Sequence, residues 1–282
     1  MTTKSPTKSP TNMTTNPRSP GIRWITLAVV AICIAYSNLT QFFDVGGLDV
    51  ADISDRHHSP FTPAPFAFAI WAIIYASFLW FCVVALLPSR RGVAIYDRLG
   101  PSLMLANVLG AAWITVFRLD WIAASVVIIL AMLALATVMF LRVSRAIETG
   151  RARFSFAVPF ALFFAWMCVA TLANLAALAI AMDWTEGARE PRIWSVAALA
   201  LATSIGLAAG IRHRQFLVPA VITWSPIAIA VADRYTDPPV SAAAIVGAVV
   251  CGIAALVIGL RRALTGPRVA IHDVWPAQPS AS

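Results

Sequence analysis

The sequence between residues 61 and 87 reads FTPAPFAFAIWAIIYASFLWFCVVALL and contains no charged side chain. Pro63 and Pro65 open it, in a loop and a first helical turn where a missing backbone N–H costs nothing. The apolar residues that follow are numerous enough to cross the hydrocarbon core of a bilayer, which takes about 20 residues in helical form. The stretch therefore predicts a transmembrane helix over roughly residues 65–87.

Four aromatic side chains recur at helical spacing within this stretch, namely Phe68, Trp71, Tyr75 and Phe78. At 100° per residue they fall within a sector of roughly 80°, so they form one aromatic stripe on one helix face. Lipid does not require such a stripe, because leucine or valine would satisfy it equally well. Two interpretations are open: aromatic packing between helices, or one wall of a pocket for a flat, apolar ligand.

The composition of the whole chain agrees with a membrane protein. It is 60% hydrophobic and 12% charged, with a mean hydropathy of +0.79, far from the averages of soluble proteins. A pI near 10 could indicate nucleic-acid binding, but the basic residues lie between apolar runs and form no single patch. We therefore expect the lipid bilayer as the partner, and no nucleic acid. The excess of arginine over lysine, 19 to 2, hints at a bacterial source.

Eight apolar runs predict an all-α, polytopic protein with about eight transmembrane helices. The runs cover roughly residues 22–39, 65–87, 101–117, 121–141, 157–181, 193–211, 216–232 and 240–260. Arg118-Leu119-Asp120 leaves room for only a tight hairpin between the third and fourth runs. Pro226 predicts a kink in the seventh. Residues 1–21 are too polar to bury a core and predict a disordered tail, and 263–282 predict a short second tail.

The basic residues also predict an orientation. If all eight runs cross, 16 of the 21 Lys and Arg residues fall on the side that holds both termini. Cytoplasmic loops carry such an excess of Lys and Arg. The sequence therefore predicts an integral protein of a bacterial cytoplasmic membrane, with its N- and C-termini in the cytoplasm.

Tryptophan, asparagine, proline and small residues recur in the second, third and fifth runs. They appear in FTPAPFAFAIWAIIY, which begins at Phe61, in Trp113-Ile114 with Phe117, and in VPFALFFAWMCVATLAN, residues 158–174. This series resembles the TspO/MBR family of tryptophan-rich sensory or translocator proteins, in particular its longer bacterial branch with extra C-terminal helices. The string Pro-x7-Trp-x3-Ala-Thr-x2-Asn, which ends at Asn174, is its most specific part.

The resemblance implies a five-helix TspO-like membrane domain over residues 22–182, followed by three additional transmembrane helices over 183–262. Members of the family are often dimeric and bind porphyrins, sterols and aromatic drug-like ligands. A homodimer and a bound porphyrin or other tetrapyrrole are therefore implied, with no cofactor required. With Phe68 from the aromatic stripe added, the expected ligand-binding residues are Phe68, Trp71, Tyr75, Trp113, Trp166, Ala170 and Asn174.

The chain departs from the family pattern in its first loop, DVGGLDVADISDRHH, which lacks the Trp-Tyr pair of shorter members. Thr62-Pro63 stands where those members have two prolines. After Asn174 there is no tyrosine with a basic residue, so sterol binding is not carried over. The missing loop aromatics also weaken the case for a tetrapyrrole.

Two asparagines lie within apolar runs, where hydrocarbon offers no hydrogen-bond partner. Asn174 shares a helix face with Trp166 and Ala170, and either bonds to another helix or contacts a ligand. Asn107 lies about 120° around its helix from Trp113, so we assign it to packing.

Three other features of the sequence give weaker indications of function. His57 and His58 follow three aspartates without a fixed ligand spacing, so we expect no metal site; a pH-sensitive lid is a second interpretation. The small residues of the last run, Ala243, Gly247, Cys251, Ala255 and Gly259, predict close packing within the chain, or a dimer face. The cysteines are isolated in apolar runs and form no pair, so we interpret them as small hydrophobes.

Apart from Arg23 at the start of the first run, no Asp, Glu, Lys, Arg or His lies within the eight runs, whereas ion-coupled transporters keep such residues at membrane depth. There is also no hydrolase, zinc or phosphate-loop motif, so we expect no enzyme and no catalytic residues. The leading hypothesis is a membrane receptor or sensor that binds a hydrophobic aromatic ligand. The alternatives are a passive carrier for a neutral solute and a structural partner of another membrane protein.

Overall fold

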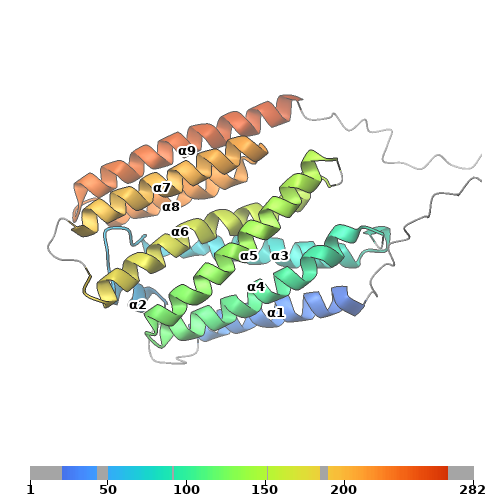
Figure 1. The fold of residues 1–282 in the computed structure, drawn as a ribbon, viewed down its shortest axis with the longest axis horizontal. Coiled ribbons are helices and arrows are strands. Elements are labelled where there is room, and N and C mark those ends of the chain that lie inside the picture. Colours follow the sequence, from blue (N-terminus) through green and yellow to red (C-terminus); the bar gives the residue numbers. More distant parts are fainter. Residues whose placement is uncertain (1–20, 43–49, 91, 151, 185–189, 266–282) are drawn as a thin grey trace, which may run out of the picture.

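The structure is a computed structural model that describes residues 21–42, 50–90, 92–150, 152–184 and 190–265. The predicted tails lie almost entirely outside these residues. The described chain is helical, and Figure 1 shows its order. The α-helices are α1 (Gly21–Phe42), α2 (Val50–Arg56), α3 (Ile70–Leu86), α4 (Ala94–Arg118), α5 (Ile122–Glu148), α6 (Ala157–Ala181), α7 (Glu190–His213), α8 (Leu217–Ala232) and α9 (Pro238–Thr265). Three 3-10 turns precede or follow them: η1 (Pro65–Ala69), η2 (Pro88–Arg90) and η3 (Phe154–Phe156).

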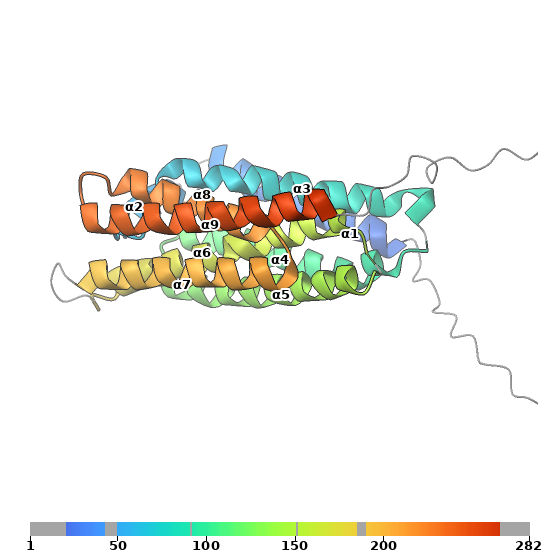
Figure 2. The same ribbon diagram turned by 90° about the horizontal axis from the view of Figure 1, so that it is seen from above.

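The all-α, polytopic prediction is confirmed. Seven of the described helices are long and apolar enough to cross a bilayer. The remaining long run forms α8, whose 16 residues span about 24 Å at 1.5 Å per residue. The long helices run along one common direction, as the view from above shows (Figure 2).

Helix α6 forms the centre of the bundle. In its apolar window 78% of the residues are buried, against 22–39% for the other six spans. It packs against α3, α5, α7 and α8, and Figure 1 shows α7, α8 and α9 on one side of it, with α4 and α1 on the other. A helix that is apolar all round is typical of such a position, so the chain is organised around α6 rather than around the stretch at 61–87.

The turns follow from local chemistry. Asp120 adopts a left-handed φ of 61° in the hairpin between α4 and α5, where its amide bonds to Phe117 O at 3.0 Å; aspartate tolerates this conformation better than most residues. Gly150, with φ of 69°, follows the end of α5 as a C-terminal glycine does. The tight hairpin expected at residues 118–120 is confirmed.

Two predicted boundaries are wrong by seven residues: the end of α5, which lies at Glu148 and not near residue 141, and the start of α4. Helix α4 begins at Ala94, not near residue 101, and Pro101 lies within it. The added turns contain Asp97, which is buried and bonded to Arg23 of α1. A charge in this position masks the helix in a hydropathy pattern, because the partner that neutralises it lies far away in the sequence.

The small residues of α9 pack within the chain, as the first interpretation expected. A Cβ on Gly247 would lie 2.8 Å from Thr203 Oγ1 of α7, so a larger residue here would force Thr203 to shift. Cys251 Sγ lies 3.9 Å from Thr203 O on the same seam. This part of α9 is therefore occupied by α7.

Candidate functional site

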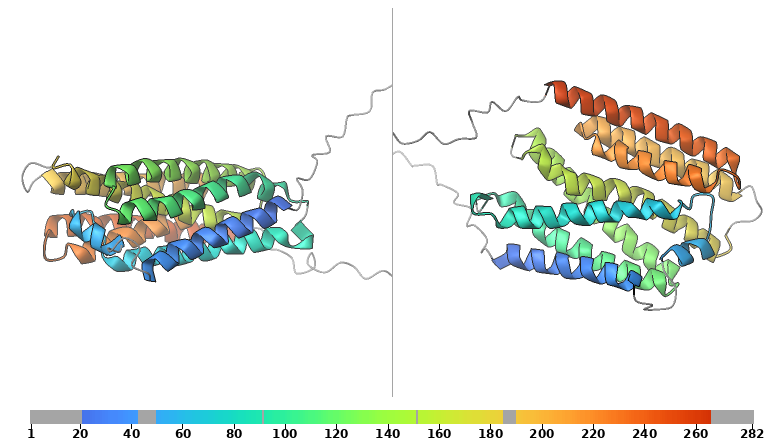
Figure 3. Two further views of the ribbon diagram at one scale, coloured as in Figure 1. Left: turned by 90° about the horizontal axis from the view of Figure 1, so that it is seen from below. Right: turned by 180° about the vertical axis from the view of Figure 1, so that it is seen from behind.

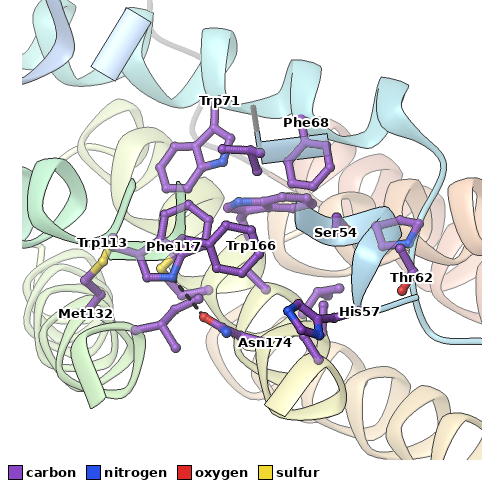
Figure 4. Close-up of a pocket in the computed structure, with 18 residues that line it drawn as sticks. Ser54, His57, Thr62, Phe68, Trp71, Trp113, Phe117, Met132, Trp166 and Asn174 are labelled. Carbon is purple, nitrogen blue, oxygen red and sulfur yellow. Dashed lines mark hydrogen bonds between the residues drawn. The ribbon is translucent and has the colours of Figure 1, made fainter. Parts of the chain in front are cut away.

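A cavity lies within the bundle at the end where α2 covers it, here called the inner cavity (Figure 4). Its volume is about 50 Å³. Five helices, η1 and the segment between α2 and η1 contribute the side chains that line it: Val50, Ser54, His57, Thr62, Pro63, Phe68, Trp71, Trp113, Phe117, Ile129, Met132, Trp166, Met167, Val169, Ala170, Ala173, Asn174 and Ala177. Six of the seven residues expected to bind ligand are among them; Tyr75 is not.

Three indole rings from three helices converge on this cavity. Trp71 of α3 and Trp166 of α6 meet edge to face, with ring centroids 6.3 Å apart. Phe68 also meets Trp166 edge to face, with ring centroids 6.3 Å apart. Trp113 of α4 stacks on Phe117 at 5.0 Å. Offset and edge-to-face contacts of this kind are favourable, and they leave flat apolar surface facing the cavity.

Asn174 connects three helices at the cavity wall. Trp113 Nε1 donates to Asn174 Oδ1 at 2.8 Å, and Asn174 Nδ2 donates to Ser125 Oγ of α5 at 2.9 Å. Ser125 Oγ in turn donates to Ile122 O at 2.7 Å. The amide therefore makes the interhelical bonds that one interpretation expected, while its side chain also lines the cavity.

Asn107 bonds within its own helix, with Nδ2 donating to Leu103 O at 2.9 Å. It is buried and does not line the inner cavity, in agreement with its assignment to packing. Phe78, the last member of the aromatic stripe, packs on Phe163 with ring centroids 5.3 Å apart. The stripe therefore divides: its start borders a cavity and its end is interhelical packing.

A second cavity, here called the outer cavity, lies between α1, α3 and α4. Its volume is about 320 Å³. Tyr75 lines it and packs against Trp71 in a tilted arrangement, with ring centroids 5.2 Å apart. Val50, Phe68, Trp71 and Trp113 line both cavities. The two spaces are thus separated only by side chains that they share.

Helix α2 is held over the inner cavity by an ion-pair cluster. His57 Nε2 lies 2.6 Å from Asp120 Oδ1, and Arg56 Nη1 lies 2.8 Å from Asp120 Oδ2. Burial raises the pKa of Asp120, but hydrogen bonds and charge from His57 and Arg56 outweigh it, so the pKa lies below its ordinary value. His57 thus pairs with Asp120 of the α4–α5 hairpin, which lies far along the chain from the aspartates that precede it.

Trp166 carries an unused donor. Its ring is 2% exposed, and its Nε1–H has no hydrogen-bond partner among the described residues. A buried donor without a partner costs about 1–3 kcal/mol. Since Trp166 lines the inner cavity, an acceptor in that cavity would recover this free energy.

The C-terminal helices support the segment that closes the site. Ala64 N donates to Ala228 O of α8 at 3.1 Å, and Trp224 Nε1 donates to Ala67 O at 3.1 Å. The Trp224 ring also meets Phe66 edge to face at 5.3 Å. Helix α8 therefore fixes η1, which carries Phe68 into the cavity wall.

Sequence reasoning missed Ser125, Phe117 and the role of Trp224. Phe117 closed the family pattern and stands one turn after Trp113, so its spacing could have placed it beside that ring. Ser125 is a single hydroxyl in an apolar run, and no pattern connects it to Asn174. The contact between Trp224 and η1 spans 157 positions and has no local signal.

The comparison with protein families gives one match, to TSPO-like protein, over residues 23–257. It extends from α1 into α9 and so includes the C-terminal helices as well as the first five spans. Comparisons with curated proteins and with solved structures gave no match. Because the matched region covers well over half of the 282 residues, the chain belongs to the TSPO-like protein family.

Proposed function

We propose that this protein is a receptor or sensor of a bacterial cytoplasmic membrane that binds a flat, aromatic, tetrapyrrole-like ligand in the inner cavity. The family supports a ligand-binding membrane protein in general. The observation that carries the finer proposal is the convergence of Trp71, Trp113 and Trp166 on one cavity. Three rings from three helices provide apolar walls that fit a planar molecule.

A few polar groups would orient the ligand. Ser54, His57 and Thr62 line the cavity beneath the first loop, and Trp166 Nε1 offers the unused donor. Sites for small molecules combine mostly apolar walls with a small number of placed polar groups. The ligand we propose therefore has a planar apolar body and at least one hydrogen-bond acceptor.

The inner cavity must enlarge to hold such a ligand. It measures about 50 Å³, whereas pockets for drug-sized ligands measure about 300–1,000 Å³. The outer cavity adds about 320 Å³ behind a shared wall. A rotation of the shared side chains would merge the two spaces without unfolding a helix.

Tryptophan fluorescence during titration with protoporphyrin IX tests the proposal. We expect saturable quenching in the parent protein and a weaker affinity in Trp71→Ala. Trp80→Ala is the matched control, because Trp80 lies on the same helix, is 46% exposed and lines neither cavity. Linear quenching without saturation, or equal losses in the two variants, would reject the site.

A further inference from the structure

We propose that the ligand enters from the bilayer, through the outer cavity between α1 and α3, and that Trp71 is the gate to the inner cavity. This inference rests on the proposed function and deepens it. It assigns the ligand to a chemical class: membrane-dissolved molecules with a flat apolar body and one polar end.

Three aromatic rings form part of the wall between the inner and the outer cavity. Phe68, Trp71 and Trp113 border both cavities, so a shift of any one of these rings would join them. Trp71 also borders a third, smaller space beneath, together with Tyr75 and Phe163. Trp71 therefore borders three separate spaces.

Trp71 is less restrained than Trp113, the other indole in this shared wall. Trp113 is fixed by its hydrogen bond to Asn174 at 2.8 Å and by stacking on Phe117. In the part of the chain that the structure describes, the half-buried Trp71 ring makes aromatic contacts and no hydrogen bond. Rotation of Trp71 therefore breaks three aromatic contacts and no hydrogen bond among the described residues.

The mouth of the outer cavity lies on the flank of the bundle. Of the residues that line it, Asn38 of α1 and Pro65, Ala69 and Ala72 on the opposite rim are exposed. Ala69 and Ala72 are three residues apart and share one face, and Pro65 begins the 3-10 turn that precedes them. Figure 3 (right) shows α1 and α3 diverging toward the α2 end, whereas Arg23 Nη1 ties α1 to Ala85 O at the other end. Since both helices are candidate membrane spans, this mouth faces lipid.

The mouth is more polar than the interior. Ser37 and Asn38 lie near the end of α1, at the level where a spanning helix approaches the bilayer surface. Asn38 Nδ2 donates to Ile34 O at 2.8 Å, which leaves its Oδ1 as an acceptor. A polar end of the ligand can stay at this level while its rings pass between Tyr75 and Trp71.

The experiment measures the rates of protoporphyrin IX binding in proteoliposomes by stopped-flow quenching. Ala72→Phe narrows the mouth, and Ala76→Phe adds the same ring one turn further along α3, where it is exposed and lines neither cavity. We expect association and dissociation to slow about tenfold in Ala72→Phe alone. The dissociation constant stays within about twofold, because a narrowed entrance changes the barrier and not the bound state.

A second variant covers the case in which Ala72→Phe fails to fold. Gly110→Leu adds a side chain from α4 at the border of the outer cavity, where a Cβ meets only Met132 Cε at 3.5 Å; Gly252→Leu in α9 is its control, with Thr223 Cγ2 at 3.7 Å. Saturable binding with unchanged rates in Ala72→Phe and Gly110→Leu overturns the entry route alone. Absence of saturable binding in the parent protein removes the proposed function, and this inference with it.

Discussion

Arg23 and Asp97 lie 74 positions apart and form a two-point ion pair, with Nε 2.7 Å from Oδ1 and Nη2 2.9 Å from Oδ2. Both side chains are buried. The same guanidinium donates from Nη1 to Ala85 O and Arg90 O, each at 2.8 Å. One side chain therefore joins the start of α1 to α3, to η2 and to α4.

Replacement of Arg23 by methionine should destabilise the protein strongly. It leaves the Asp97 carboxylate buried without its partner, which costs about 3–5 kcal/mol. The control is Arg98→Gln, because Arg98 follows Asp97 in α4 and its side chain is exposed. This substitution should change stability by less than about 0.5 kcal/mol. Unfolding in mild detergent measures both, and equal stability of the two variants would contradict the role given to the pair.

Ser125→Ala should reveal how far Asn174 holds the helices together. Loss of the 2.9 Å bond to Asn174 Nδ2 should lower the free energy of unfolding by about 1 kcal/mol in the ligand-free protein. Thr137→Ala, also in α5, removes a hydroxyl that bonds only to its own helix at Leu133 O and is the control. If the two variants unfold alike, the Asn174 network contributes nothing to packing.

Asp120→Asn should weaken the hold of α2 in a pH-dependent way. The folded pKa of Asp120 lies below its ordinary value, so the carboxylate stabilises the fold above the unfolded pKa of about 3.9. That stabilisation is lost as the pH falls through the folded pKa. We expect the variant to be less stable at pH 7, by about 1 kcal/mol or less because the pair is partly exposed.

Asparagine tolerates the left-handed φ of 61° at this position, so the substitution tests the charge and not the turn. Stability is followed by thermal unfolding from pH 7 to pH 3, and the two curves should converge at the acidic end. A constant difference across this range would mean that the carboxylate charge is irrelevant.

Asp233→Asn should stabilise the protein above the folded pKa of Asp233, whereas Asp120→Asn should destabilise it. Burial raises the pKa of Asp233 to about 6, a hydrogen bond from Thr236 opposes the rise, and the nearby Asp237 adds to it. A raised folded pKa stabilises the protein fully below the unfolded value of about 3.9, and this contribution is lost as the pH rises through about 6. Oδ2 of Asp233 also has no partner among the described residues.

The neutral amide should therefore make the protein more stable at pH 8, by about 1–3 kcal/mol, and should remove the change between pH 4 and pH 7. Unfolding curves of both proteins at these pH values decide the matter. A variant that is less stable at pH 8 would show that the charged carboxylate has a favourable role.

Trp224→Phe should loosen η1 while keeping an aromatic ring beside Phe66. The substitution removes the 3.1 Å bond to Ala67 O, so amide hydrogen exchange should rise in residues 64–72. Protoporphyrin IX affinity should fall about two- to tenfold, because Phe68 is less firmly placed. Trp184→Phe, a 66% exposed residue outside both cavities, is the control.

Much of the fold could be predicted because a membrane-spanning helix is specified by the apolar residues of its own segment. Eight apolar runs predicted the eight long helices, and the stripe from Phe68 to Tyr75 pointed to the region of both cavities. Helix α2 was missed because its seven residues carry too little apolar pattern to differ from a loop. The start of α4 was missed because the partner of Asp97 lies in α1.

The aromatic residues of the site could be predicted from the sequence, but the pairs of polar side chains that join its helices could not. Trp71, Trp113 and Trp166 could be placed from spacing and resemblance, and the structure brings them to one cavity. The pairing of His57 with Asp120, and of Asn174 with Ser125, depends on which helix ends meet in space. No residue pattern along one helix contains that information.

The segment before η1 is bonded to α8 through two main-chain atoms, Ala64 N and Ala228 O. The side chains at both positions can therefore change over evolution while this hydrogen bond persists. Paired substitutions in related sequences would not reveal it. A shortened protein that ends at residue 182 would keep all seven expected ligand-binding residues and still lose the support of η1. Ligand screens on such a fragment would report on a differently shaped site.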